Sequence, residues 1–191
     1  DAALRRHALL ATLEGCDRAA RVVDQLLTLS RLEAEGAPAL QPLDLCPVVR
    51  DVVAELAPQA LAKGQPLELE AAPACRVAGD PTLLAVLVRN LIDNALRYSP
   101  RRACVQVHVG RTDGRVVLRV DDSGPGLDAP DLQRLGERFF RAAGGGESGS
   151  GLGWSIAQRI ASAHGGTLSA RRSEALGGLA VKLVLPAVDR G

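Results

Sequence analysis

The chain has 191 residues, of which 47% are hydrophobic, and its 23 basic and 22 acidic residues leave a net charge of +1. This length and apolar content suffice for a buried core, whereas the even charge balance argues against nucleic-acid binding and against a polybasic membrane patch. The four cysteines form no CxxC pair, which argues against a zinc site and fits a reducing compartment. No apolar run is long enough to span a membrane and no signal peptide opens the chain. Because the chain starts with Asp1 and contains no Met, we expect it to be a piece of a longer protein.

The first 34 residues predict one or two helices with an apolar seam. Small or apolar side chains recur there at alternating steps of three and four. The seam positions are Leu9, Leu13, Cys16, Ala20, Val23 and Leu27. The following segment, EGAPALQP, has the composition of a linker. We therefore expect a helical segment over residues 1–36 and a separate globular domain over residues 37–191.

The rest of the chain alternates between helical and strand patterns. Helical patterns occupy 47–63, 81–97, 129–136 and 152–164. Alternating patterns, typical of strands, occupy 66–72, 105–109, 115–120, 166–172 and 179–186. Pro58 should bend or end the first of these helices, Asp80 should cap the second, and Asp113-Gly114 predicts a tight hairpin. Helices mixed with mostly antiparallel strands in this order predict an α/β fold, a two-layer α/β sandwich.

The stretch NLIDNALRYSP, residues 90–100, places two asparagines one turn apart in a leucine-rich helix, although Asn is a poor helix former. On a helical wheel Asn90, Asn94 and Arg97 fall within about 40° of one another, at the border of the apolar face. Two amide oxygens so placed suit Mg²⁺, which takes one or two protein oxygens together with substrate phosphates and water. The alternative is that both asparagines are ordinary polar residues on a helix surface.

Two glycine-rich stretches follow. VDDSGPG, residues 120–126, leaves a strand and enters a loop, and its Asp122 is an acceptor for a purine amino group. GSGLGW, residues 149–154, places three glycines directly before a helix N-terminus, where free N–H groups and the helix dipole suit phosphate. Each stretch taken alone is equally well explained as a loop or a helix cap.

In combination these motifs resemble the catalytic ATP-binding domain of sensor histidine kinases, which belongs to the superfamily of gyrase, Hsp90, kinase and MutL ATPases (the GHKL or Bergerat fold). NLIDNALRYSP resembles the N box, VDDSGPG the first glycine box, GERFFR the F box and GSGLGWSIAQRIASAHGG the second glycine box, and GGLAVKLVLP stands in the place of the final box. GCDRAARVVDQLLTLSRLE, residues 15–33, resembles the second helix of the dimerisation and phosphotransfer hairpin. The resemblance covers nearly the whole chain and is nearest to the QseC-like branch.

The resemblance implies ATP and Mg²⁺ as cofactors. Asn94 would be the main Mg²⁺ ligand, with Asn90 assisting. Arg97 would lie near the phosphates, Tyr98 would lie beside the adenine, and Asp122 would accept the adenine amino group. The other implied nucleotide-binding residues are Gly124, Gly126, Arg138, Arg141, Gly149, Gly151, Leu152 and Gly153. The two arginines would reach the γ-phosphate or, alternatively, be ordinary exposed residues, and residues 138–150 would form a mobile lid.

The family phosphorylates a histidine in a motif similar to HELRTP, and neither His7, His108 nor His164 lies in such a motif. His108 is expected on a solvated strand face, and His164 ends a helix, where a cation would interact favourably with the dipole. We expect the acceptor histidine to lie upstream of Asp1, so this chain should not autophosphorylate on its own.

The resemblance further implies that the phosphoryl group passes from the histidine to an aspartate of a response regulator. It implies a homodimer formed through the helical segment, and a chain that is the cytoplasmic portion of a bacterial inner-membrane protein. Membrane contact would occur only through absent upstream segments, and no nucleic-acid partner is expected.

Several other functions are compatible with single motifs. GPGLDA, residues 124–129, fits a dinucleotide-binding fingerprint, but no strand ending in an acidic residue follows at the required distance. A P-loop enzyme is excluded because GxxxxGK[ST] does not occur. An ATPase clamp of the Hsp90 or MutL type and a degenerate dimerisation module without nucleotide binding both remain open. Trp154, which stands where the family usually has Leu, is the only feature that favours the degenerate module.

Overall fold

The computed structural model describes residues 39–137, 140 and 151–188, together with eight positions near the N-terminus. These eight positions are 5, 6, 9, 12, 15, 16, 23 and 27, and all are helical. Of the predicted seam, Leu9, Cys16, Val23 and Leu27 are exposed, while Leu13 and Ala20 lie outside the described residues. The predicted lid also lies outside them, apart from Phe140.

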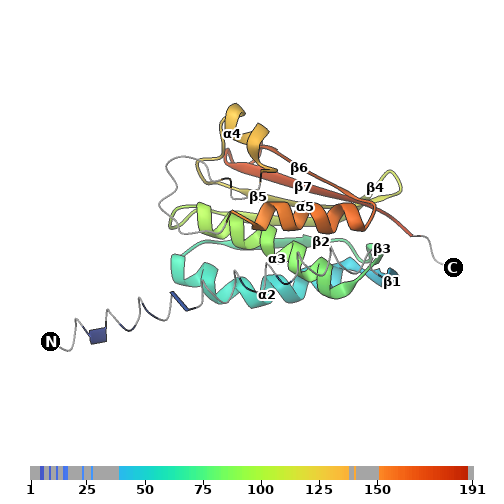
Figure 1. Cartoon of the computed structure of the whole chain (residues 1–191), viewed down its shortest axis with the longest axis horizontal. Coiled ribbons are helices and arrows are strands. Elements are labelled where there is room, and N and C mark those ends of the chain that lie inside the picture. The colour runs from blue at the N-terminus through green and yellow to red at the C-terminus, as the bar shows by residue number, and fades with distance from the viewer. Residues whose placement is uncertain are drawn as a thin grey trace.

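The fold has two layers, a five-stranded mixed sheet and a layer of helices against one of its faces (Figure 1). The strand order is β2-β4-β5-β7-β6, in which β2 runs parallel to β4 and all other neighbours are antiparallel. The sheet consists of β2 (Leu67–Ala71), β4 (Val105–Thr112), β5 (Arg115–Asp122), β6 (Thr167–Arg172) and β7 (Leu179–Pro186). The helix layer consists of α2 (Leu45–Lys63), α3 (Pro81–Tyr98) and α5 (Gly153–Ala163), and the short helix α4 (Ala129–Arg134), which has no buried residue, lies apart from it (Figure 1). The predicted two-layer α/β sandwich is confirmed.

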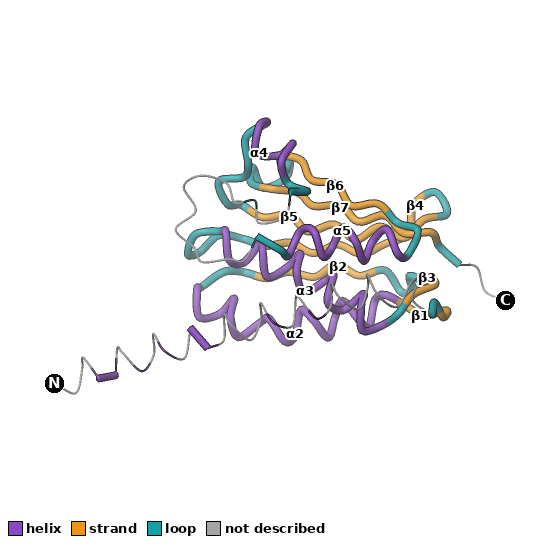
Figure 2. Tube along the Cα trace, viewed as in Figure 1, coloured by secondary structure: helices purple, strands orange, loops and turns teal. Residues whose placement is uncertain are grey.

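The central strands are apolar on one face and mixed on the other, where Val117 and Val184 lie among polar residues. Along β5, Val116, Leu118 and Val120 are buried, and the residue between the last two, Arg119, is half-buried on the opposite face. Helices α3 and α5 pack against each other and over the apolar face of the sheet (Figure 2). Each fully buried Leu or Val contributes about 1.5–3 kcal/mol, so this single core accounts for the register of the strands.

Two strands were not predicted from the sequence. β1 (Gln41–Asp44) and β3 (Arg76–Gly79) pair with each other as a separate two-stranded sheet. Each strand has only four residues, which is too short for alternation to be recognised. β1 also supplies the cap of α2, because the Asp44 carboxylate accepts hydrogen bonds from the backbone of Cys46 (3.0 Å) and Cys75 (2.9 Å).

Pro58 was predicted to bend or end its helix, and the structure excludes the second outcome, because α2 continues through Pro58 to Lys63. A proline removes the hydrogen bond to the carbonyl four residues earlier, which belongs to Ala54. Both Pro58 and Ala54 are exposed, so water can satisfy that carbonyl. The helix ends instead at Gly64, whose φ of 64° is left-handed and favours glycine.

The expectation that His164 would be a cation at a helix end was also wrong. Its side chain is buried, with 3% of its surface exposed. The Asp80 N–H donates to Nε2 at 3.0 Å, and Nδ1 lies 2.7 Å from the Ile160 carbonyl oxygen. Since Nε2 accepts, Nδ1 carries the proton and the imidazole is neutral. His164 therefore ties the end of α5 to the residue that caps α3.

We expect His164→Ala to lower the free energy of unfolding by about 2–4 kcal/mol, because it leaves a cavity and an unsatisfied buried N–H. The matched control is His108→Ala, which removes a histidine whose side chain is 45% exposed beside Glu70. That variant should change stability by about 0.5 kcal/mol or less. Urea denaturation of both variants measures the difference, and equal destabilisation would contradict the assignment.

Candidate nucleotide-binding site

Helix α3 carries the two asparagines. Its N-terminus is fixed by Asp80, whose Oδ1 accepts a hydrogen bond from the Leu83 N–H at 2.9 Å, and Pro81 occupies the first turn as predicted. Asn90 and Asn94 are half-buried on the side of α3 that faces α5. A Cβ atom added to Gly153 would lie 3.3 Å from Asn90 Oδ1 and 3.6 Å from Asn94 Nδ2. The structure thus brings the N-box amides and the second glycine stretch together.

Gly153 is the first residue of α5, and this helix has no side-chain cap at its N-terminus. Leu152, directly before it, is buried, so its side chain belongs to the core and only its backbone can contribute to a site. Gly151 has a φ of 69°, which favours glycine. A helix N-terminus whose first residue lacks a side chain admits an anionic group close to its backbone N–H groups.

A second group of predicted site residues surrounds Asp122, the last residue of β5. Its side chain is 7% exposed, and its Oδ1 accepts hydrogen bonds from the N–H groups of Gly124 (2.9 Å) and Leu179 (3.2 Å). Both backbone bonds converge on one oxygen. Within the described residues, no backbone donor reaches Oδ2.

Burial raises the pKa of the Asp122 carboxyl, and the hydrogen bonds from Gly124 and Leu179 and the nearby Ser99 hydroxyl offset this only in part. Ser99 is itself 3% exposed, and its hydroxyl makes no well-directed hydrogen bond within the described part of the chain. A buried hydroxyl without a well-directed partner therefore lies beside a carboxylate that already accepts two backbone hydrogen bonds. Such a hydroxyl is costly unless a ligand or water satisfies it.

Close packing requires glycine at three positions near Asp122, two in the loop after β5 and one directly before β7. Gly126 has a φ of 71°, and a Cβ there would lie 3.2 Å from the Gly178 carbonyl oxygen. A Cβ on Gly124 would lie 2.9 Å from Asp122 Oδ1 and equally close to the Ser99 hydroxyl. Gly178 is the most crowded, because its Cβ would lie 2.3 Å from Asp122 Oδ1. Ser99 and Gly178 were not predicted, although both lie inside stretches that resemble family motifs.

Gly178→Ala should therefore lower the free energy of unfolding by about 2 kcal/mol, because its methyl group displaces the Asp122 carboxylate or the loop. Gly136→Ala is the matched control, since its Cβ would meet only the flexible end of Gln158, at 3.3 Å. Thermal unfolding of the two variants measures the effect. If Gly178→Ala is as stable as the control, the close packing around Asp122 is not as described.

The C-terminal end of α3 carries Arg97 and Tyr98, two further residues that were predicted to contact ATP. The Arg97 guanidinium donates to Asp93 Oδ2 at 2.8 Å, and Asp93 Oδ1 accepts from Gln59 of α2 at 3.1 Å. Arg97 is thus half-buried and held against its own helix, and Tyr98 beside it is exposed. The Gln65 side chain closes this helix end by donating to the carbonyl oxygens of residues 96, 99 and 100.

Three predicted site residues, Arg138, Arg141 and Gly149, lie outside the described residues. Trp154 is half-buried and packs against the core. In the described part of the chain no group of three or more His, Cys, Asp and Glu residues could hold a metal ion.

Comparison with known proteins gives a consistent result. Residues 79–189 match the family described as histidine kinase-, DNA gyrase B- and HSP90-like ATPases. Sensor protein QseC of Escherichia coli (strain K12) is 41% identical over 167 residues, which are 86% of this chain and 36% of that protein. The chain thus spans about a third of the length of the curated relatives it matches.

No helix in the described residues is long and apolar enough to cross a membrane.

Two solved structures are also similar. The cytoplasmic segment of histidine kinase QseC is 30% identical, with a TM-score of 0.59 over 91% of this chain and 95% of that one. Full-length ShkA in complex with AMPPNP is 27% identical, with a TM-score of 0.79 over 97% of this chain and 40% of that one.

Proposed function

Because the chain belongs to the histidine kinase-, DNA gyrase B- and HSP90-like ATPase family, we propose that it is the catalytic ATP-binding part of a sensor histidine kinase. It transfers the γ-phosphoryl group of ATP to a histidine that lies outside this chain. The observation that carries this proposal is the position of Gly153, where an added Cβ atom would lie within 4 Å of both the Asn90 and the Asn94 amide. This arrangement places two amide oxygens, which suit a hard cation, next to a helix N-terminus, which suits phosphate.

The proposed roles divide between the two ends of the site. Asn94 is the principal Mg²⁺ ligand and Asn90 assists it, while the backbone at Gly151, Leu152 and Gly153 receives the phosphates. A bound Mg²⁺ would neutralise the charge of the triphosphate. The amide pair fits such an ion because Mg²⁺ needs few protein oxygens when phosphates supply the others.

The residues around Asp122 bind the adenine base. Asp122 Oδ2 accepts the hydrogen bond of the adenine amino group, and Gly124 and Gly126 leave room for the ring. Tyr98 lies beside the base. Arg97 contacts the phosphates after exchanging its ion pair with Asp93, and Arg138, Arg141 and Gly149 complete the lid side.

The whole protein is proposed to act as a two-component sensor. Residues 1–36 form part of a dimerisation and phosphotransfer hairpin, residues 37–191 the catalytic domain, and the response regulator receives the phosphoryl group. The exposed seam residues Leu9, Val23 and Leu27 support a partner helix there. The chain would be the cytoplasmic portion of a bacterial inner-membrane protein.

Labelling with [γ-³²P]ATP tests this function in the longer protein that carries the acceptor histidine. We expect label that survives alkali and is released by acid, as phosphohistidine is. The same protein with the acceptor histidine replaced by Gln is the control and should remain unlabelled. ATP hydrolysis without any labelled histidine would favour an ATPase clamp instead.

A further inference from the structure

β5 ends in two consecutive carboxylates that point to opposite faces of the sheet. Asp122 points toward the helix layer and the nucleotide site. Asp121 points to the opposite face, on which none of the helices α2, α3 and α5 packs (Figure 1), yet only 3% of its surface is exposed. A buried carboxylate on an open sheet face is costly unless it is paired, so its partners indicate what it does.

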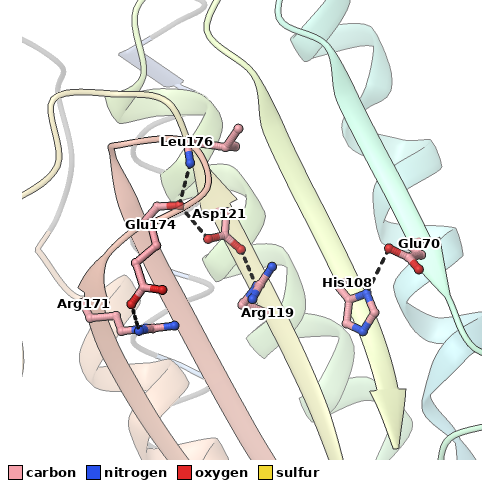
Figure 3. Close-up of polar contacts among 8 residues, drawn as sticks. Glu70, His108, Arg119, Asp121, Arg171, Glu174 and Leu176 are labelled. Carbon is pink, nitrogen blue, oxygen red and sulfur yellow. Dashed lines mark hydrogen bonds and ion pairs between the residues drawn. The ribbon is translucent and has the colours of Figure 1, made fainter.

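The partners of Asp121 come from its own strand and from the loop between β6 and β7 (Figure 3). The Ser173 hydroxyl donates to Asp121 Oδ1 at 2.7 Å and accepts a hydrogen bond from the Leu176 N–H at 3.1 Å. Arg119 Nε lies 2.6 Å from Asp121 Oδ2, as an ion pair rather than a well-directed hydrogen bond. Ser173 is 3% exposed, so its bond to Asp121 is shielded from water.

Ser173 also closes the turn that leads into β7. Its N–H donates to the Gly178 carbonyl oxygen at 2.7 Å, and its own carbonyl oxygen accepts from the Gly177 N–H at 3.0 Å. The far end of this turn contacts Asp122 directly. The Gly178 N–H donates to the Asp122 carbonyl oxygen at 3.1 Å, and the Leu179 N–H donates to Asp122 Oδ1 at 3.2 Å.

We propose that Asp121 and Ser173 are positioning residues for base recognition. By anchoring the turn, they hold the Leu179 N–H against Oδ1 of Asp122, which fixes the rotation of that carboxylate and presents Oδ2 to the amino group of a purine. This inference rests on the proposed role of Asp122 in binding ATP. A carboxylate that is already held in one rotamer loses no rotational freedom when the ligand binds, whereas a mobile carboxylate does lose it.

The test compares ATP with purine riboside triphosphate, which lacks the 6-amino group, by calorimetric titration of the chain. Ser173→Ala should lower the affinity for ATP about tenfold and leave that for purine riboside triphosphate nearly unchanged. Ser173→Thr keeps the hydroxyl and should restore the preference. Ser169→Ala is the matched control, because that exposed serine makes only a long 3.5 Å bond to the Lys182 carbonyl oxygen.

A Ser173→Ala variant that binds both nucleotides equally weakly would show a merely structural role and overturn the proposal. The proposal is also overturned if Ser173→Ala keeps the wild-type preference for ATP over purine riboside triphosphate while Asp122→Asn loses it. A wild-type chain that binds both triphosphates equally well would overturn the role of Asp122 and this proposal together. If Ser173→Ala does not fold, Asp121→Asn takes its place, and it should reduce the preference for ATP about threefold.

Discussion

Asp122→Asn should weaken ATP binding by about 100-fold or more while leaving the fold intact. The Asn side chain keeps an oxygen that can accept the Gly124 and Leu179 N–H bonds, both of which go to Oδ1. It places an NH₂ group in the position of Oδ2, so that this donor would face the amino group of adenine, which is also a donor. Titration with ATP and thermal unfolding of the same variant measure the two effects separately.

The pKa of Asp122 decides the sign of the stability change. Burial raises this pKa above its usual value of 3.8. Protonation is therefore favoured in the folded state, and the ionised carboxylate costs stability at neutral pH. Asn removes that cost, so the variant should be at least as stable as the wild type above pH 3.8. Affinity of the wild type for ATP should fall with decreasing pH before an ordinary aspartate would protonate. A variant that binds ATP normally would refute the assignment of Asp122.

Asn94→Ala should reduce phosphoryl transfer in the longer protein by about 100-fold or more, because the triphosphate loses its main Mg²⁺ ligand from the protein. Ala is a better helix former than Asn, and Asn94 is only half-buried, so α3 should persist. Incorporation of ³²P from ATP measures the change.

Thr82→Ala is the matched control on the same helix, since Thr82 is exposed in the first turn of α3. Its labelling should equal that of the wild type. If Asn94→Ala also labels normally, then the amide pair does not hold the metal ion, and the proximity of Asn90 and Asn94 to Gly153 serves packing alone.

The sequence predicted those elements whose patterns are long. The cap of α3 at Asp80, the hairpin at Asp113-Gly114 and the order of helices and strands follow from local rules, and the structure confirms them. β1 and β3 have four residues each and leave no readable period. α2 continues through Pro58 because the hydrogen bond lost there faces water, which depends on the fold and not on the local sequence.

The site was predictable where a motif marks it and unpredictable where contacts are distant. Asn94 and Gly153 are far apart in the chain, and only the resemblance to a family suggested that they meet. Asp121 and Ser173 are joined by a hydrogen bond across 52 positions, and neither lies at a spacing that indicates a pair. His164 looked like a helix-end cation because its contact with Asp80, across 84 positions, is equally invisible in the sequence.

The most direct test of the central claim is calorimetric titration of this chain with ATP, with and without Mg²⁺. We expect saturable binding of one ATP per chain that strengthens when Mg²⁺ is present, because the amide pair and the α5 N-terminus act on the same phosphates. No heat at millimolar ATP in the presence of Mg²⁺ would contradict the account, and the degenerate dimerisation module would become the better explanation.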